Sequence, residues 1–366
     1  MAAGAKLADF GGWQMPIEYQ GVVAEHAAVR SAVGIFDVSH MGKVRIHGDG
    51  AVDALNAVLA NDLDRIGDGR AQYTLLCNES GGVVDDLIVY RWSQDEVFMV
   101  PNAANAATVV AALRAVLPVG VLVDDHHDDH GIIAVQGPRS AQAVAALGLP
   151  ADHDYMTMAS ATYAGARAIV CRTGYTGEHG YELVLPTASL GIAWDALIEL
   201  QPTLGLVPAG LGARDTLRTE MGYPLHGQDI SPSISPVQAG LGWAVGWDKP
   251  AFAGRDALAG ERAAGPSRRL RGLLARGRSI PRPHMRVHRA AAAGSLDAGA
   301  DQGPALGEVI GEVTSGTFSP TLRQGIALAL LDPGIALGDE VYVDVRGRAA
   351  AFEVVAPPFV QTSTRS

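Results

Sequence analysis

The alternation of apolar and polar positions predicts short strands interleaved with helices over most of the chain. Helical spacing of apolar residues predicts helices at 22–33, 103–117, 187–200 and 211–221, with shorter ones through Leu55 and up to Leu147. Alternation with a period of two predicts strands at 35–47 with a break at Gly42, 71–78, 83–91, 97–100, 119–123, 131–136, 161–163, 166–172 and 181–185. Helices that alternate with short, hairpin-linked strands are typical of an α+β fold.

The pattern changes beyond residue 260. Gly260–Ser267 predicts a linker, and Arg289–Gly303 contains few bulky side chains, which predicts a mobile insertion. Short strands with Gly and Pro turns follow to the end of the chain, and they predict a small all-β C-terminal domain. Because 366 residues exceed what a single hydrophobic core usually organises, we expect two or three domains.

The strand predicted after the turn Ser80-Gly81-Gly82 has the most unusual pattern in the chain. Its alternation gives two faces, composed of Val83, Asp85, Leu87 and Val89 on one side and Val84, Asp86, Ile88 and Tyr90 on the other. Both faces are mainly apolar, so we expect a central strand that is covered on both sides and receives one carboxylate on each. Burying an unpaired charge costs several kcal/mol. Each aspartate therefore either caps the turn or meets an arginine, or one of them is a catalytic carboxylate at the floor of a cleft.

Composition and charge narrow the classes of function. The 48% hydrophobic and 18% charged residues are typical of a soluble globular protein, and the net charge of −11 argues against nucleic acid and anionic membranes as partners. The chain contains no apolar run as long as a membrane span and no signal or transit segment, so we expect a cytoplasmic protein. Cys77 and Cys171 each lie in a strand-like run, which fits buried thiols in a reducing compartment.

Several apparent motifs fail on closer inspection. Asp124–His130, DDHHDDH, has metal-ligand residue types in a predicted loop, which favours a solvated turn, and Gly210–Asp215 lacks the third glycine of a dinucleotide loop. HExxH, CxxC and Walker motifs are missing from the sequence. Lysine occurs only at positions 6, 43 and 249. The eight arginines of Arg268–Arg289 are therefore partly compositional, although a docking surface for an acidic partner remains an alternative.

Three further segments combine glycine with dense polar residues, namely Gly174–Leu185, Gly210–Asp229 and Val313–Leu322. Glu182 begins an otherwise apolar strand, and Arg214 lies near the start of a predicted helix, where a cation opposes the helix dipole and favours a specific anion. A fixed carboxylate accepts the paired N–H groups of a 2-amino-4-oxo ring such as a pterin. An ordinary salt bridge between Glu182 and Arg214 is the alternative.

Five motifs, in this order, resemble the aminomethyltransferase family, the T-proteins of the glycine cleavage system. They are FDVSHMG at 36–42, SGGVVDDLIVY, GYTGEHGYE, GLGARDTLR and TSGTFSPTL, and the resemblance extends from about Gly4 to Val360. It implies a three-domain cloverleaf with tetrahydrofolate in the central opening. The expected parts are a discontinuous first domain (1–47 and 137–262), a ferredoxin-like second domain (48–136) and a jelly-roll-like all-β C-terminal domain (263–366).

The resemblance also implies a function and a set of site residues. The function is transfer of a one-carbon unit from aminomethyl-dihydrolipoyl H-protein to tetrahydrofolate, which releases ammonia and gives 5,10-methylenetetrahydrofolate. Tetrahydrofolate is a co-substrate and lipoylated H-protein is the partner, with no metal, flavin, nicotinamide, nucleic acid or membrane. The essential aspartate falls on Asp85 and the pterin-anchoring pair on Glu182 and Arg214. The positions that line the folate pocket fall on Met41, Tyr73 and Asn102.

Two departures and three related activities bear on this expectation. Members usually carry further residues ahead of GAKLADFGGW, and an Arg or Tyr near the folate where this chain has Gln361-Thr362. A related folate-dependent demethylase would share the aspartate and the pocket but use a small methyl donor. A non-catalytic folate-binding relative typically carries KGCYxGQE, which this sequence lacks, and a sarcosine-type oxidase needs an attached FAD domain.

Overall fold

A six-stranded sheet is one of the three larger β-structures in the described part of the chain. The computed structural model describes residues 4–291, 305–362 and 364. The strands of this sheet are β3 (Val33–Asp37), β9 (His130–Gln136), β10 (Met158–Tyr163), β11 (Ala166–Cys171), β12 (Gly180–Pro186) and β13 (Leu206–Pro208), in the order β10-β11-β12-β9-β3-β13. The helices that follow its strands are α4 (Ser140–Ala146), α5 (Thr187–Ile198) and α6 (Gln201–Leu204). Apolar side chains of α4 and α5 pack on the sheet and form its core.

A five-stranded antiparallel sheet is inserted between β3 and β9. It consists of β4 (Val44–His47), β5 (Ala71–Cys77), β6 (Val83–Ser93), β7 (Glu96–Val100) and β8 (Leu122–Asp125), in the order β5-β6-β7-β4-β8. The helices in this part are α2 (Ala51–Asn56), η1 (Leu63–Arg65), η2 (Ala103–Asn105) and α3 (Ala106–Val116). Val109 and Leu113 of α3 pack against Leu87 and Val89 of β6, so this central strand is covered as its apolar pattern predicts.

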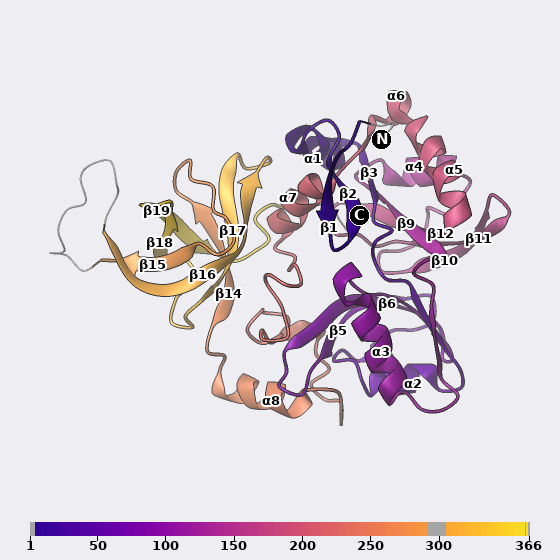
Figure 1. Cartoon of the computed structure of the whole chain (residues 1–366), viewed down its shortest axis with the longest axis horizontal. Coiled ribbons are helices and arrows are strands. Elements are labelled where there is room, and N and C mark those ends of the chain that lie inside the picture. The colour runs from indigo at the N-terminus through magenta and orange to yellow at the C-terminus, as the bar shows by residue number, and fades with distance from the viewer. Residues whose placement is uncertain (1–3, 292–304, 363, 365–366) are drawn as a thin grey trace.

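The C-terminal part is a closed six-stranded barrel. Its strands are β14 (Arg269–Ala275), β15 (Arg286–Ala290), β16 (Leu306–Ser319), β17 (Gln324–Leu331), β18 (Glu340–Val345) and β19 (Arg348–Val355), in the order β14-β17-β16-β15-β18-β19. Figure 1 shows the barrel in orange and yellow on one side of the molecule and the two sheets on the other. Val313, Ala327 and Phe352 are among the side chains that fill the interior.

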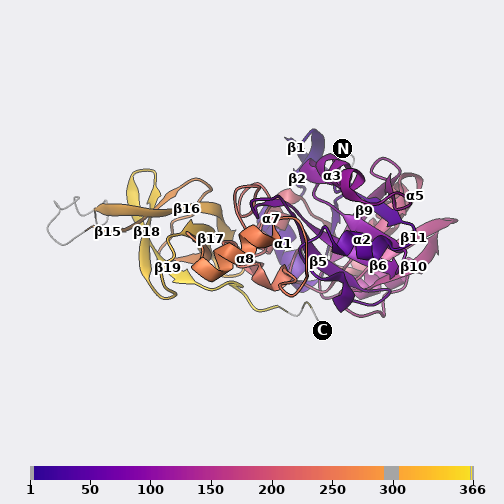
Figure 2. The same cartoon turned by 90° about the horizontal axis from the view of Figure 1, so that it is seen from below.

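The remaining elements connect these three structures. They are the hairpin β1 (Lys6–Phe10) and β2 (Trp13–Glu18), the helices α1 (Val22–Ser31), α7 (Leu211–Met221) and α8 (Arg255–Ala264), and the short η3 (Gly242–Ala244). Helix α7 lies between the barrel and the sheets in both views (Figures 1 and 2). Leu217 of α7 joins Phe36, Tyr90 and Met158 in an apolar cluster to which both sheets contribute.

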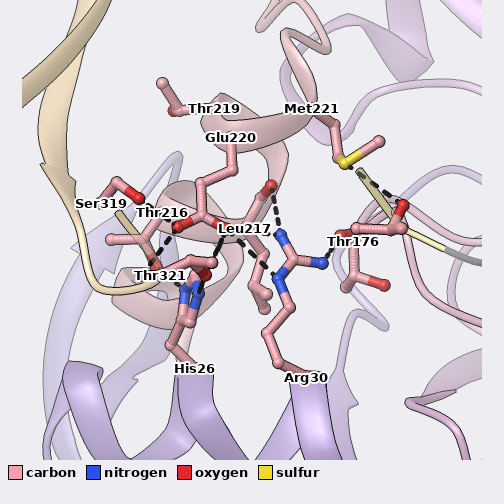
Figure 3. Close-up of polar contacts among 12 residues, drawn as sticks. His26, Arg30, Thr176, Thr216, Leu217, Thr219, Glu220, Met221, Ser319 and Thr321 are labelled. Carbon is pink, nitrogen blue, oxygen red and sulfur yellow. Dashed lines mark hydrogen bonds and ion pairs between the residues drawn. The ribbon is translucent and has the colours of Figure 1, made fainter. Parts of the chain in front are cut away.

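A buried charge network fastens the barrel to α1 and α7 (Figure 3). Glu220 of α7 is fully enclosed and accepts hydrogen bonds from Arg30 Nη2 at 2.7 Å and from Thr321 Oγ1 at 3.0 Å. His26 Nε2 lies 3.3 Å from the same carboxylate, and Ser319 also donates to it. Burial raises the pKa of Glu220. The hydrogen bonds and charges of its partners, of which His26 has the largest effect, outweigh burial and lower the pKa to about 2. Glu220 is therefore ionised at neutral pH.

The structure confirms the α+β class and corrects several predicted elements. The strand expected at 35–47 is two strands in different sheets, because the chain crosses over at Gly42, whose N–H bonds to the carbonyl of Pro101 at 2.8 Å. The linker expected at 260–267 is helical as far as Ala264, because Leu258 anchors α8 while Gly260 faces solvent. The strand expected at 119–123 is β8, which begins only at Leu122.

Two expectations cannot be compared fully with the structure. The insertion expected at 289–303 begins in the last residues of β15, and its part from 292 onwards lies outside the described residues. The domain bounds 1–47 with 137–262, 48–136 and 263–366 stay predictions.

Candidate functional site

The start of β6 is shaped by two glycines and a bulge. Gly81 has a φ of 84°, and a Cβ on Gly82 would lie 1.9 Å from the carbonyl oxygen of Pro232, so neither position accepts a side chain. The register then shifts, because Cys77 pairs with Val83 whereas Leu76 pairs with Asp85, which leaves one extra residue in β6. This bulge therefore sets the positions of Asp85 and Asp86 along the strand.

Asp85 is completely enclosed and strongly hydrogen-bonded. Its Oδ1 accepts from Asn102 Nδ2 at 2.9 Å and from Asn105 Nδ2 at 2.7 Å, and its Oδ2 accepts from the backbone N–H of Asn102 at 3.0 Å. Burial, and next the charge of Asp86, nevertheless raise the pKa of Asp85 to about 7. At neutral pH this group is therefore poised between its acid and its base form.

Asp86 is the partly exposed member of the pair. It accepts from Asn102 Nδ2 at 2.8 Å and from the hydroxyl of Tyr73 at 3.0 Å. Burial raises the pKa of Asp86, against the effect of the Tyr73 hydrogen bond. The two aspartates thus share one amide donor although they leave β6 on opposite faces. We expected the contacting carboxylate at Asp85; that residue has no exposed surface, whereas Asp86 is partly exposed, so both carboxylates remain candidates for the contact.

His226 extends this hydrogen-bond network through Asn105. Its Nε2 lies 3.0 Å from the carbonyl oxygen of Val83, which only accepts, so Nε2 carries the proton. Its Nδ1 then accepts from Asn105 Nδ2 at 3.0 Å, and the second N–H of the same amide goes to Asp85. The histidine therefore fixes the orientation of Asn105. The sequence did not predict a role for His226. The one signal was its position inside the polar segment Gly210–Asp229.

Glu182 and Arg214 form a second polar group. Glu182 Oε2 accepts from the hydroxyl of Thr173 at 2.6 Å, while its Oε1 has no hydrogen-bond partner among the described residues. The structure contains no salt bridge between Glu182 and Arg214 within 4.0 Å, which argues against the ordinary ion-pair interpretation. Arg214 Nη1 is buried and lacks a hydrogen-bond partner in the described part of the chain. Burial lowers the pKa of Arg214, although the charge of Glu182 opposes this.

Tyr175 lies between the two polar groups. The guanidinium of Arg214 lies 4.7 Å from the centre of its ring. Burial raises the pKa of Tyr175, Asp86 raises it further and Arg214 lowers it, so both charges lie near this side chain. Tyr73 is also an electrostatic neighbour of Tyr175. The carboxylate pair and the Glu182–Arg214 group are therefore parts of one site.

Aromatic and apolar side chains surround these polar groups. Tyr73 stacks on Trp243 with ring centres 5.4 Å apart, and Trp243 is 65% exposed. His40 is buried, and burial followed by the charge of Arg214 lowers its pKa to about 3, so it is neutral. Its Nδ1 has no partner among the described residues. Met41 packs in the apolar cluster between the sheets and shares no hydrogen bond with the other predicted site residues.

The described residues hold neither a cluster of metal ligands nor a membrane-spanning helix. They contain no group of three or more His, Cys, Asp or Glu side chains arranged to hold a metal ion. In the predicted turn Asp124–His130, His126 instead lies 3.6 Å from Asp129 and edge-on to His130. Within the same residues, no helix is long and apolar enough to cross a membrane.

Family models match nearly the whole chain. Residues 1–249 match the model described as "GCVT N-terminal domain", and residues 268–361 match the model described as "Glycine cleavage T-protein C-terminal barrel domain". The second range coincides with the closed barrel, and the first contains both sheets.

Proteins of known name are similar over the same length. An aminomethyltransferase of Parafrankia sp. (strain EAN1pec) is 60% identical over 99% of this chain and 96% of its own length. An aminomethyltransferase of Mycobacterium tuberculosis is 56% identical over 99% of this chain and 95% of its own length. The crystal structure of glycine cleavage system aminomethyltransferase T from Bartonella henselae superposes with a TM-score of 0.88 at 33% identity, and covers 98% of this chain and 95% of that one.

Proposed function

Because the chain belongs to the glycine cleavage T-protein family, and is thus an aminomethyltransferase of the glycine cleavage system, we propose its substrates and its catalytic groups. The one-carbon unit comes from the aminomethyl-dihydrolipoyl arm of H-protein and passes to tetrahydrofolate. Ammonia and 5,10-methylenetetrahydrofolate are the products. The observation that carries this proposal is the buried, unpartnered Nη1 of Arg214 beside the free Oε1 of Glu182. We also propose that the three β-structures form the family's cloverleaf, with a ferredoxin-like second domain and a jelly-roll-like third.

The polar group around Glu182 supports recognition of the pterin ring. A pterin edge offers two N–H donors and a carbonyl oxygen side by side. Glu182 accepts the two donors, with Thr173 holding its carboxylate in place at 2.6 Å, and Arg214 Nη1 donates to the carbonyl. A buried N–H without an acceptor costs about 1–3 kcal/mol, so the free enzyme is relieved of that cost when folate binds. Met41, Tyr73 and Asn102 remain our candidates for the walls of the pocket.

The carboxylate pair supports the proton transfers. The N5 and N10 hydrogens of tetrahydrofolate must leave, one to ammonia and one to the lipoyl sulfur, while the carbon atom bonds to both nitrogens. We propose that Asp86 contacts the folate and accepts the N5 proton, because it is the partly exposed residue of the pair. Asp85, with a pKa of about 7, sets the proton affinity of the pair and helps to stabilise a developing iminium cation.

The exclusion of water is the third requirement of this chemistry. The carbon in transit reacts with water to give formaldehyde, so the lipoyl arm must be held against N5 in a shielded space. Tyr73, stacked on the exposed Trp243, forms an aromatic wall beside Asp86. No metal or redox cofactor takes part in the proposed reaction. The free, buried thiols of Cys77 and Cys171 fit a reducing compartment, and we propose the cytoplasm.

Release of ammonia from aminomethylated H-protein tests the proposal. We expect release only when tetrahydrofolate is present, with stoichiometric formation of methylenetetrahydrofolate and of H-protein thiol. Arg214→Gln should weaken folate binding, whereas Arg348→Gln, which changes an exposed arginine of the barrel, serves as the matched control. Transfer from small methylated amines or thioethers in place of H-protein would instead assign the chain to the folate-dependent demethylases.

A further inference from the structure

A small hollow opens where the barrel meets the end of α8, apart from the residues assigned above. Its volume is about 280 Å³. The residues that line it are Val237, Gln238, Gly240, Arg262, Gly265, Pro266, Arg269, Leu270 and Arg271. None of the residues proposed for folate binding or catalysis belongs to this set, although Arg269 and Arg271 lie in the arginine-rich run Arg268–Arg289.

The frame of the hollow is fixed by hydrogen bonds around Gln238. This side chain accepts from Arg268 Nε at 2.9 Å and donates to Glu261 of α8, also at 2.9 Å. The backbone N–H of Leu270 bonds to the carbonyl of Gln238 at 2.8 Å. Glu261 thus bonds to Gln238, and it forms no ion pair with an arginine among the described residues.

Three guanidinium groups line this frame without acceptors. Arg262, Arg269 and Arg271 make no hydrogen bond and no ion pair with other described residues, and Arg262 is held 4.4 Å above the ring of Trp247. Arg271 Nε is buried and unpartnered in the described part of the chain. Burial, and next the charge of Arg269, lower the pKa of Arg271. An anion in the hollow would satisfy the buried donor of Arg271 and reduce the repulsion between Arg269 and Arg271.

We propose that this hollow is a binding site for a compact dianion, either phosphate or a short dicarboxylate. Three arginine side chains select oxygen anions that accept several N–H bonds at once. A volume of about 280 Å³ lies just below the usual range of ligand sites, which favours a compact ligand. The chain carries a net charge of −11, so this local excess of positive charge is not a general property of its surface.

Calorimetric titration of the full-length protein with inorganic phosphate and, separately, with succinate tests this site at low ionic strength. We expect saturable binding of at least one anion, and the comparison identifies which chemistry the site prefers. Arg271→Gln should weaken that binding by about tenfold or more, because it removes a charge-assisted donor. Arg348→Gln, an exposed change outside the hollow, should leave it unchanged. Equal unfolding midpoints of the two variants establish that both remain folded.

Several outcomes would overturn the proposal. One is binding of neither anion in the wild-type protein, and another is an Arg271→Gln variant that binds as tightly as the wild type. If neither anion binds and Arg271→Gln raises KM for H-protein, the arginines serve an acidic protein surface and the small-ligand site is wrong. Because the titration involves no turnover, its result is independent of the proposed aminomethyl transfer.

Discussion

The difference in exposure between two adjacent aspartates decides which of them can meet a substrate. Asp85 is enclosed by Asn102 and Asn105, whereas Asp86 is open to solvent on one side. Asp86→Asn should lower kcat for ammonia release by about a hundredfold or more, because an amide cannot accept the N5 proton. Folate affinity and the unfolding midpoint should change little.

Asp85→Asn is the matched comparison for that variant. The new amide group would face the donors of Asn102 and Asn105, so we expect a lower urea midpoint and a smaller loss of kcat than in Asp86→Asn. Measurement of kcat, folate Kd and urea midpoint for both variants separates the two roles. The opposite order of kcat losses would return the contacting role to Asp85.

Glu182 should act on binding before it acts on rate. Glu182→Gln replaces one acceptor oxygen by an NH2 group that opposes the donors of the pterin edge. We expect a loss of about 2–3 kcal/mol in folate affinity, measured by calorimetry. The hydroxyl of Thr173 can still donate to the remaining carbonyl oxygen, so the fold should be unaffected. An unchanged Kd would mean that Glu182 does not contact the pterin.

His226 offers a test of how Asp85 is positioned. Glutamine can reproduce both of its hydrogen bonds, since its NH2 group donates to the carbonyl of Val83 and its oxygen accepts from Asn105. His226→Gln should therefore retain kcat within about threefold, whereas His226→Phe frees Asn105 and should lower kcat by about tenfold, with folate Kd unchanged. Equal kcat values for the two variants would show that orientation of Asn105 is irrelevant to the rate.

At the scale of elements, apolar patterns predicted the fold better than they predicted the site. The covered strand β6 and the all-β end of the chain follow from local alternation and turn residues. The bulge at the start of β6 and the crossover at Gly42 do not, because both depend on contacts with Pro232 and Pro101. The carboxylate pair was visible in the sequence, but which carboxylate stays exposed depends on Asn102, seventeen residues beyond Asp85.

The turn between β14 and β15 remains our candidate for docking of an acidic carrier. Arg276 pairs with Glu353 at 3.0 Å, and Arg278 is exposed. Reversing both charges to Glu should raise the apparent KM for H-protein while kcat and folate Kd stay constant. The effect should shrink with added salt, since exposed charges are screened over about 10 Å at 0.1 M ionic strength. An unchanged KM at low salt would move the docking surface elsewhere.

At the scale of the molecule, the network around Glu220 makes the attachment of the barrel sensitive to acid. Its pKa is lowered from 4.5 to about 2, so its contribution to stability is present above pH 4.5 and is lost as the pH falls towards 2. Glu220→Gln should destabilise the protein at neutral pH by on the order of 3 kcal/mol and flatten this acid dependence. Urea denaturation from pH 7 to pH 3 measures both effects, and Glu79→Gln, an exposed change, is the control. An equally steep dependence in both variants would contradict this account.

The insertion of one sheet between β3 and β9 also constrains the order of folding. Gly34 pairs with Gln136, so the six-stranded sheet is completed only when the ends of a very long loop meet. Closing an open coil of that length costs conformational entropy before any contact compensates for it. Prior collapse of the five-stranded unit shortens the effective loop, because its β4–β8 pairing brings Val44 beside Asp125. The contacts between the two sheets, such as those that gather Phe36, Tyr90 and Met158, therefore form late, as the outer sheet closes over a unit that is already folded.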